Sequence, residues 1–149
     1  MKIVDSSGWV EYLTRGPLFE QYREHTSDPT SLITPTIILY EVYKRVLQQA
    51  GSKSAEDAAG MLLKTQVIPL DHSTALLSAE LSVKHRLAMA DAIIYATARS
   101  HTATLVTSDK HFEGLPGVLF IPLPQQEAAG ETAEGGKAPP DGTAEPAPL

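Results

Sequence analysis

Five short apolar segments alternate with helix-forming segments along residues 1–124, and this alternation constrains the fold more than any other feature of the sequence. The apolar segments lie at 2–5, 31–34, 67–70, 104–107 and 118–121. Strands that are separated by helices favour an open parallel sheet, because each parallel connection has to cross the sheet and usually does so as a helix. The pattern therefore predicts a three-layer α/β/α domain around a five-stranded parallel sheet.

The segments between the strands carry helix start and stop signals. Ser6 and Ser7 offer N-caps for a helix through residue 13, and Pro17 suits the first turn of a second helix. Gly51 is expected to end a long helix that begins at 35–36. Further helices are expected at 54–65, 72–85 and 89–101, with a single turn near 109–112. The two consecutive helices before the fourth strand can carry the chain across the sheet, which predicts the strand order 3-2-1-4-5.

Residues 125–149 differ in composition from the rest of the chain. This segment is rich in Ala, Gly, Pro and Glu and has no aromatic residue, so we expect a disordered tail that follows a domain at 1–124. The net charge of −6 is unevenly distributed, because the tail holds five acids and one base whereas residues 1–124 hold 13 acids and 11 bases. The nearly balanced domain is compatible with a polyanionic substrate but has no strong Lys/Arg cluster.

The chain has no cysteine, which excludes disulfides and zinc–thiolate sites. Its longest apolar runs are far shorter than the ~20 residues of a membrane span. The apolar stretch in residues 1–5 is too short for a signal peptide, and an acid follows at once. We expect a cytoplasmic protein with no membrane association.

Four acids stand where a predicted strand ends or a helix begins: Asp5, Glu41, Asp91 and Asp109. In open parallel sheets, ligands bind at the carboxyl ends of the strands where the strand order reverses, which is here between strands one and four. Asp5 ends strand one and Asp109 follows strand four. Two like charges 4 Å apart repel by about 4 kcal/mol at an effective dielectric constant near 20. A hard divalent cation would relieve this repulsion, so the acids predict a metal site.

Each acid also has an ordinary structural explanation. Asp5 and Asp109 can cap helices, and Asp91 can complement the dipole at the start of a helix. Glu41 can pair with Arg45 at the i, i+4 spacing, although such a pair contributes only a few tenths of a kcal/mol. Thr107 can place its hydroxyl at the sheet edge and orient a water molecule or a carboxylate.

The segments around these acids resemble the PIN-domain family, and within it the VapC-type toxins of bacterial toxin–antitoxin pairs. The matching segments are 4–7, Glu41 early in its helix, 87–98 and 104–112, and the resemblance extends from residue 2 to about 122. It implies a five-stranded parallel sheet of order 3-2-1-4-5 and an Mg²⁺- or Mn²⁺-dependent endoribonuclease. Its metal ligands would be Asp5, Glu41, Asp91 and Asp109, with Thr107 in a supporting role.

The resemblance also implies a biological setting. The protein would be the toxin of a type II toxin–antitoxin system, a homodimer that cleaves RNA by water attack on a phosphodiester and is restrained by a cognate antitoxin protein. As a hypothesis from proximity in the sequence, Lys84, Arg86 and Lys110 form the rim that meets the RNA backbone. Solvated surface charge is the alternative for each of them.

Other functions fit the same alternation of strands and helices. A housekeeping PIN-fold nuclease that processes RNA, or a non-catalytic RNA-binding protein, would share the fold. A receiver-like module needs a pair of acids at the end of the first strand, and a haloacid-dehalogenase-type phosphatase needs a second Asp two residues after the first. Ser6 and Ser7 stand at those positions. The five histidines form no metal motif, and we interpret His111 as shielding Phe112.

Overall fold

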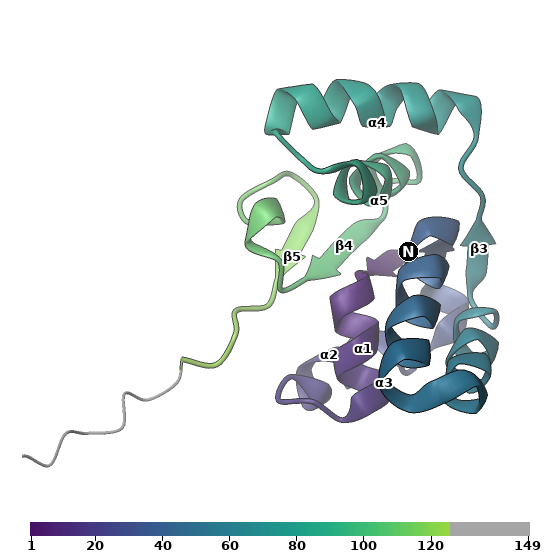
Figure 1. Ribbon diagram of the computed structural model, residues 1–149. Helices are drawn as coiled ribbons and strands as arrows, with labels where there is room; N and C mark the ends of the chain where they lie inside the picture. Colours follow the sequence, from purple (N-terminus) through teal and green to yellow (C-terminus); the bar gives the residue numbers. More distant parts are fainter. Residues whose placement is uncertain (126–149) are drawn as a thin grey trace, which may run out of the picture.

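The computed structural model describes residues 1–125 of the chain (Figure 1). The predicted tail at 125–149 lies outside the described residues except for Gln125, so the two-part division of the chain remains a prediction. The elements, in chain order, are β1 (Lys2–Val4), α1 (Ser6–Thr14), α2 (Phe19–Thr26), η1 (Pro29–Ser31), β2 (Ile33–Pro35), α3 (Thr36–Leu62), β3 (Gln66–Ile68), α4 (His72–His85), α5 (Met89–Ser100), β4 (Thr104–Thr107), η2 (Lys110–Phe112) and β5 (Val118–Phe120).

The strands pair in parallel, in two hydrogen-bonded parts. One part has the order β1-β4-β5 and the other pairs β2 with β3. A single parallel bridge between Lys2 and Leu32 connects β1 to the residue before β2. The neighbours within each part agree with the predicted order, but the single five-stranded sheet is not continuous. Pro35 ends β2 without an N–H to donate, which limits the pairing that so short a strand can offer.

Helices cover the strands in two groups. In Figure 1, α4 and α5 lie together above β4, whereas α1, α2 and α3 lie together below it. The predicted helix end at Gly51 is confirmed as an interruption of α3, because Gly51 adopts φ 83° and ψ 178°, a conformation that disfavours any residue with a Cβ. The chain then resumes a helical path to Leu62, which corresponds to the helix predicted at 54–65.

The core lies on both sides of the strands, toward α5 on one side and toward α1, α2 and α3 on the other. Every residue of α5 from Ala92 to Ala98 is buried, because the helix packs on β4 and is covered on its outer side by α4. Tyr95 and Phe112 are among the largest buried side chains, and their rings lie 6.3 Å apart. Although α5 is apolar, no helix within residues 1–125 combines the length and hydropathy that crossing a bilayer requires. This packing fixes the N-terminus of α5, and with it Asp91, beside the ends of the strands.

Candidate metal centre

Asp5 follows β1 and is 4% exposed. Its Oδ1 accepts a hydrogen bond from the backbone N–H of Ser6 at 2.7 Å, and its Oδ2 accepts from the hydroxyls of Ser7 at 3.2 Å and Thr107 at 2.8 Å. Asp5 is therefore the N-cap of α1, and the prediction that Ser6 and Ser7 cap this helix was wrong. The extended backbone of Asp5, which continues the strand, leaves its carboxylate beside the first free N–H groups of the helix.

Thr107 connects two of the predicted site acids. This residue ends β4, is fully buried, donates its hydroxyl to Asp5 and accepts the backbone N–H of Asp109 on the same oxygen at 3.0 Å. The backbone N–H of Asp5 in turn donates to the carbonyl of Val106 at 3.0 Å. The parallel pairing of β1 with β4 thus brings both strand ends together, and the hydroxyl orients a carboxylate as the sequence predicted.

Asp91, Asp109 and His111 form a compact group of partly exposed side chains. Nδ1 of His111 lies 2.9 Å from Oδ1 of Asp109 and 3.9 Å from Oδ2 of Asp91. Within residues 1–125, these are the three side chains whose ligand atoms come within 4.8 Å of one another, close enough to hold one ion. The side chains of Asp91 and Asp109 are 21% and 33% exposed, so solvent and ligands reach them.

His111 is a site residue that sequence reasoning missed. We interpreted it as a shield for Phe112, and Phe112 is indeed buried, but the ring of His111 is 72% exposed and turns toward the acids. The available signal was its position two residues after Asp109 in a single helical turn, where the first and third residues approach each other.

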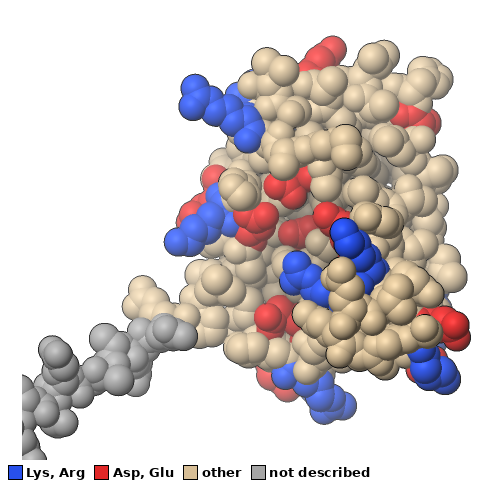
Figure 2. All heavy atoms as spheres, in the orientation of Figure 1, with Lys and Arg blue, Asp and Glu red and all other residues tan. Residues whose placement is uncertain are grey.

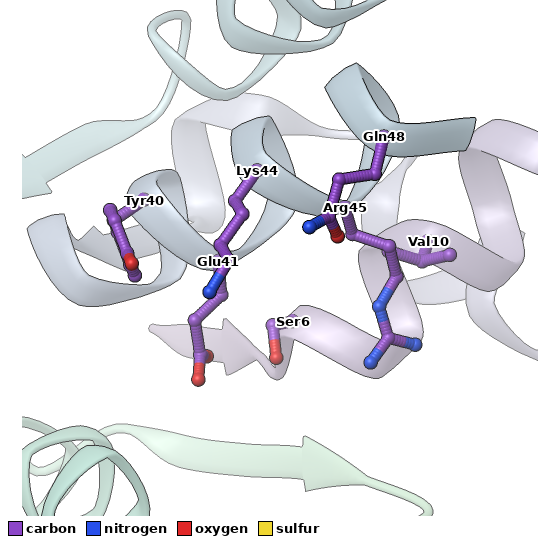
Figure 3. A pocket seen from close by; sticks show the side chains of 7 residues that line it. All are labelled: Ser6, Val10, Tyr40, Glu41, Lys44, Arg45 and Gln48. Atoms are coloured by element: carbon purple, nitrogen blue, oxygen red, sulfur yellow. The ribbon is translucent and has the colours of Figure 1, made fainter. Parts of the chain in front are cut away.

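Glu41 lies in the second turn of α3 and lines a pocket between α3 and α1. The other lining residues are Ser6, Val10, Tyr40, Lys44, Arg45 and Gln48. Figure 3 shows the Glu41 carboxylate and the Ser6 hydroxyl pointing to the same side of this pocket. The ion pairs among the described residues do not include Glu41 with Arg45, although the positive charge of Arg45 acts to lower the pKa of Glu41 against the larger effect of burial.

The four acids are close enough for the charges of three of them to shift the pKa of the fourth, Asp91. The pKa of Asp91 is raised to about 6, first by burial and then by the negative charges of Asp109, Asp5 and Glu41, while His111 opposes the rise. Burial is also the main cause that raises the pKa of Asp5 and of Glu41, and each of these acids carries an added contribution from a neighbouring acid. Figure 2 shows acidic side chains gathered at the centre of this face. The structure therefore brings the four acids together, and two of them, Asp91 and Asp109, belong with His111 to the group whose ligand atoms lie within 4.8 Å of one another.

The basic residues around the site differ in part from those that the sequence suggested. Lys84 lies in the last turn of α4, Arg86 is its left-handed C-cap, and Lys110 begins η2, and all three are exposed. Their role as a substrate rim remains a prediction. Lys44 and Arg45 line the Glu41 pocket directly and were missed, although their positions three and four residues after Glu41 place them on the same helix face.

The chain matches a known family and several known structures. The profile of the PIN domain matches residues 2–118. No curated protein sequence matches the chain. A toxin–antitoxin complex from Klebsiella pneumoniae contains a chain of similar structure, with 24% identity, a TM-score of 0.70, and coverage of 83% of this chain and 100% of that one.

Two further solved structures have a similar fold. VapC20 from Mycobacterium tuberculosis, a toxin that cleaves the sarcin–ricin loop, is 18% identical, with a TM-score of 0.64 and coverage of 76% of this chain and 92% of that one. The DNA-bound VapBC complex from Salmonella typhimurium gives 20% identity, a TM-score of 0.61, and coverage of 82% and 98%. At these identities the likeness shows a shared fold.

Proposed function

The chain belongs to the PIN-domain family, and from that premise we propose that it is a metal-dependent endoribonuclease. The observation that carries the proposal is the convergence of four acids from separate parts of the chain around Asp91, whose pKa burial and these charges together raise to about 6. A fold does not assemble mutually repelling carboxylates at low stability cost, so a compensating ligand is expected at this place.

The donor set fits a hard divalent cation. Carboxylate oxygens are the ligands that Mg²⁺ and Mn²⁺ favour, and the proposed ligands are Asp5, Glu41, Asp91 and Asp109. A bound Mg²⁺ or Mn²⁺ supplies Lewis-acid polarisation of a phosphodiester and a water molecule that is easier to deprotonate. Thr107 is a positioning residue in this scheme, because its hydroxyl holds the carboxylate of Asp5 and the backbone of Asp109 in a fixed relation.

The proposed substrate is RNA, whose phosphates need positive charge next to the acids. Lys44 and Arg45 line the pocket beside Glu41, and Lys110 directly follows Asp109. These residues, together with Lys84 and Arg86, are the proposed contacts to the RNA backbone. The site thus combines an acidic centre for the ion with basic residues for the polyanion.

The biological role that we propose is that of a VapC-type toxin in a type II toxin–antitoxin system. The solved structures of similar fold include the toxin–antitoxin complex from Klebsiella pneumoniae and the VapBC complex from Salmonella typhimurium. A cognate antitoxin protein, a homodimeric state, a cytoplasmic location and a complete strand order of 3-2-1-4-5 belong to the same proposal. A housekeeping RNA-processing nuclease with the same acids is the alternative.

The decisive experiment is an RNA cleavage assay with the full chain, titrated with Mg²⁺ and Mn²⁺. The wild type should cleave, chelator should stop cleavage, and Asp91→Asn should reduce it at least 100-fold, since comparable single-residue losses at catalytic sites reach 10²–10³. Asp57→Asn is the matched control, because Asp57 is an exposed acid that pairs only with Lys53 among the described residues. Cleavage that survives chelator or Asp91→Asn contradicts the proposal, and binding of RNA without cleavage supports a non-catalytic protein.

A second experiment separates the toxin from the housekeeping nuclease. Expression of the wild type in a bacterial host should arrest growth, Asp91→Asn should not, and co-expression of the proposed cognate antitoxin should restore growth. A host that tolerates the active enzyme favours the housekeeping alternative.

A further inference from the structure

An imidazole stands within the acid cluster and has no place in the four-carboxylate site proposed above. We propose that His111 is a direct metal ligand together with Asp91 and Asp109, and that it makes this centre favour Mn²⁺ over Mg²⁺. The inference rests on the proposed metal site and specifies which ion that site takes.

The distances between the donor atoms fit one octahedral ion. With bonds of about 2.1 Å, an octahedral ion holds neighbouring donor atoms about 3 Å apart and opposite ones about 4 Å apart. Nδ1 of His111 lies 2.9 Å from Oδ1 of Asp109 and 3.9 Å from Oδ2 of Asp91. These two spacings match those of one coordination shell, and the three ligand atoms all lie within 4.8 Å of one another.

The backbone holds the imidazole in this place. Asp109 caps η2 by accepting the backbone N–H of His111 on Oδ1 at 2.9 Å. The next residue, Phe112, is fully buried and its ring packs near that of Tyr95. The turn is thus anchored in the core on one side, while the exposed ring of His111 faces the acids on the other. An ion can enter from solvent and meet a ligand that is already in position.

The chemistry of the donor set decides which ion is favoured. Mg²⁺ takes oxygen ligands almost exclusively and retains water, so a nitrogen donor adds little to its binding. Mn²⁺ shares the preference for carboxylates but, as a first-row transition ion, it also accepts imidazole nitrogen. One imidazole between two carboxylates therefore strengthens Mn²⁺ binding more than Mg²⁺ binding.

The direct test is pulsed electron paramagnetic resonance of the full chain loaded with Mn²⁺. The wild type should show the coupling of a directly coordinated imidazole ¹⁴N, and His111→Gln should lose it. His72→Gln is the matched control, because His72 is an exposed histidine beside Asp71 at the start of α4 and is not part of the cluster. Its spectrum should be that of the wild type.

The same variants separate the two ions in equilibrium titrations. His111→Gln should weaken Mn²⁺ binding on the order of tenfold, the size typical for loss of a group that supports a metal site, and should change Mg²⁺ binding by less than about twofold. His111 is exposed, so its replacement should leave the circular dichroism spectrum and the thermal transition unchanged.

The outcomes distinguish failure of this inference from failure of the proposed function. If the wild type binds neither ion, the metal-dependent nuclease itself is contradicted. If Mn²⁺ binds and Asp91→Asn abolishes binding, but the wild type shows no ¹⁴N coupling, the metal site stands and His111 lies beside the acids without binding the ion. Equal loss of Mg²⁺ and Mn²⁺ affinity in His111→Gln likewise overturns the proposed preference.

Discussion

The phenol of Tyr22 lies 2.7 Å from the hydroxyl of Ser108, which is 86 residues further along the chain. Ser108 stands between Thr107, which orients Asp5, and Asp109, which forms a group with Asp91 and His111 that could hold an ion. The fully buried ring of Tyr22 therefore connects α2 to the loop that presents the site. This contact exists only because the chain folds α2 against α1 and β1, next to the loop that follows β4.

Tyr22→Phe should loosen that loop without unfolding the protein. Loss of one buried hydroxyl hydrogen bond costs about 1 kcal/mol of unfolding free energy. Divalent-ion affinity should fall severalfold, because Ser108, the residue before Asp109, loses its hydrogen-bond partner. Tyr95→Phe is the matched control, since its hydroxyl donates to the carbonyl of Pro116 at 2.9 Å, which lies outside the site. If both variants lose stability but neither loses ion affinity in calorimetric titration, Tyr22 has no positioning role.

Gly8→Ala should disrupt the same contact from the opposite side. A Cβ on Gly8 would lie 2.2 Å from the ring of Tyr22, so the ring or α1 has to move. We expect a loss of about 1–3 kcal/mol, as for other overpacked core positions. Gly60→Ala, on an exposed helical position with open space around it, should instead stabilise the protein by about 0.5–1 kcal/mol. Urea unfolding measures both, and an unchanged midpoint for Gly8→Ala would contradict the close packing.

Thr107→Val removes the hydroxyl of this side chain while keeping nearly the same volume, so it tests the role of the hydroxyl alone. Valine fills nearly the same space, but it leaves Oδ2 of Asp5 with only the weaker bond from Ser7 and leaves the backbone N–H of Asp109 without its acceptor. Unsatisfied buried polar groups cost about 1–3 kcal/mol. Thr107→Ser keeps the hydroxyl and should retain most of the cleavage rate, whereas Thr107→Val should lose most of it. Equal rates for the two variants in the RNA assay would show that the hydroxyl does not matter.

Asp91 makes the stability of the metal-free protein depend on pH. Its pKa is about 6 in the folded protein and close to 3.8 in the unfolded chain, so between these values the folded state binds more protons. The free energy of unfolding should therefore fall as pH rises from about 4 to 6, and then level off. The shift corresponds to at most about 3 kcal/mol. In chelator, Asp91→Asn should remove most of this slope, and Asp57→Asn should keep it. A wild type whose stability rises through the same window would contradict the assignment.

Divalent ions should stabilise the wild type and leave Asp91→Asn unaffected. A ligand that binds only the folded state at 100 times its dissociation constant adds about 2.7 kcal/mol. The effect should weaken below pH 6, where protons compete with the ion for Asp91. Thermal unfolding of both proteins with and without Mn²⁺ at pH 5 and pH 7.5 measures this. Equal stabilisation of wild type and Asp91→Asn would place the ion elsewhere.

Local sequence signals were sufficient for most of the secondary structure. The helix predicted at 72–85 and the strand at 104–107 have the predicted bounds, and Gly51 interrupts α3 where a helix end was expected. These signals act between near neighbours, through apolar periodicity, capping and glycine backbone freedom. The second strand was misplaced at 31–34, because η1 extends through Ser31 and β2 begins only at Ile33.

The sequence by itself determined which acids lie at strand ends and helix starts, because those positions follow from local patterns. Only the tertiary structure decided how they are arranged. It assigns Asp5 to a cap held by Thr107, joins Asp91 and Asp109 to His111, and surrounds Glu41 with Lys44 and Arg45. The physical reason is that these relations depend on the register of β1 against β4 and on the packing of α5 beside them. Residues about a hundred positions apart then meet at distances that no local pattern encodes.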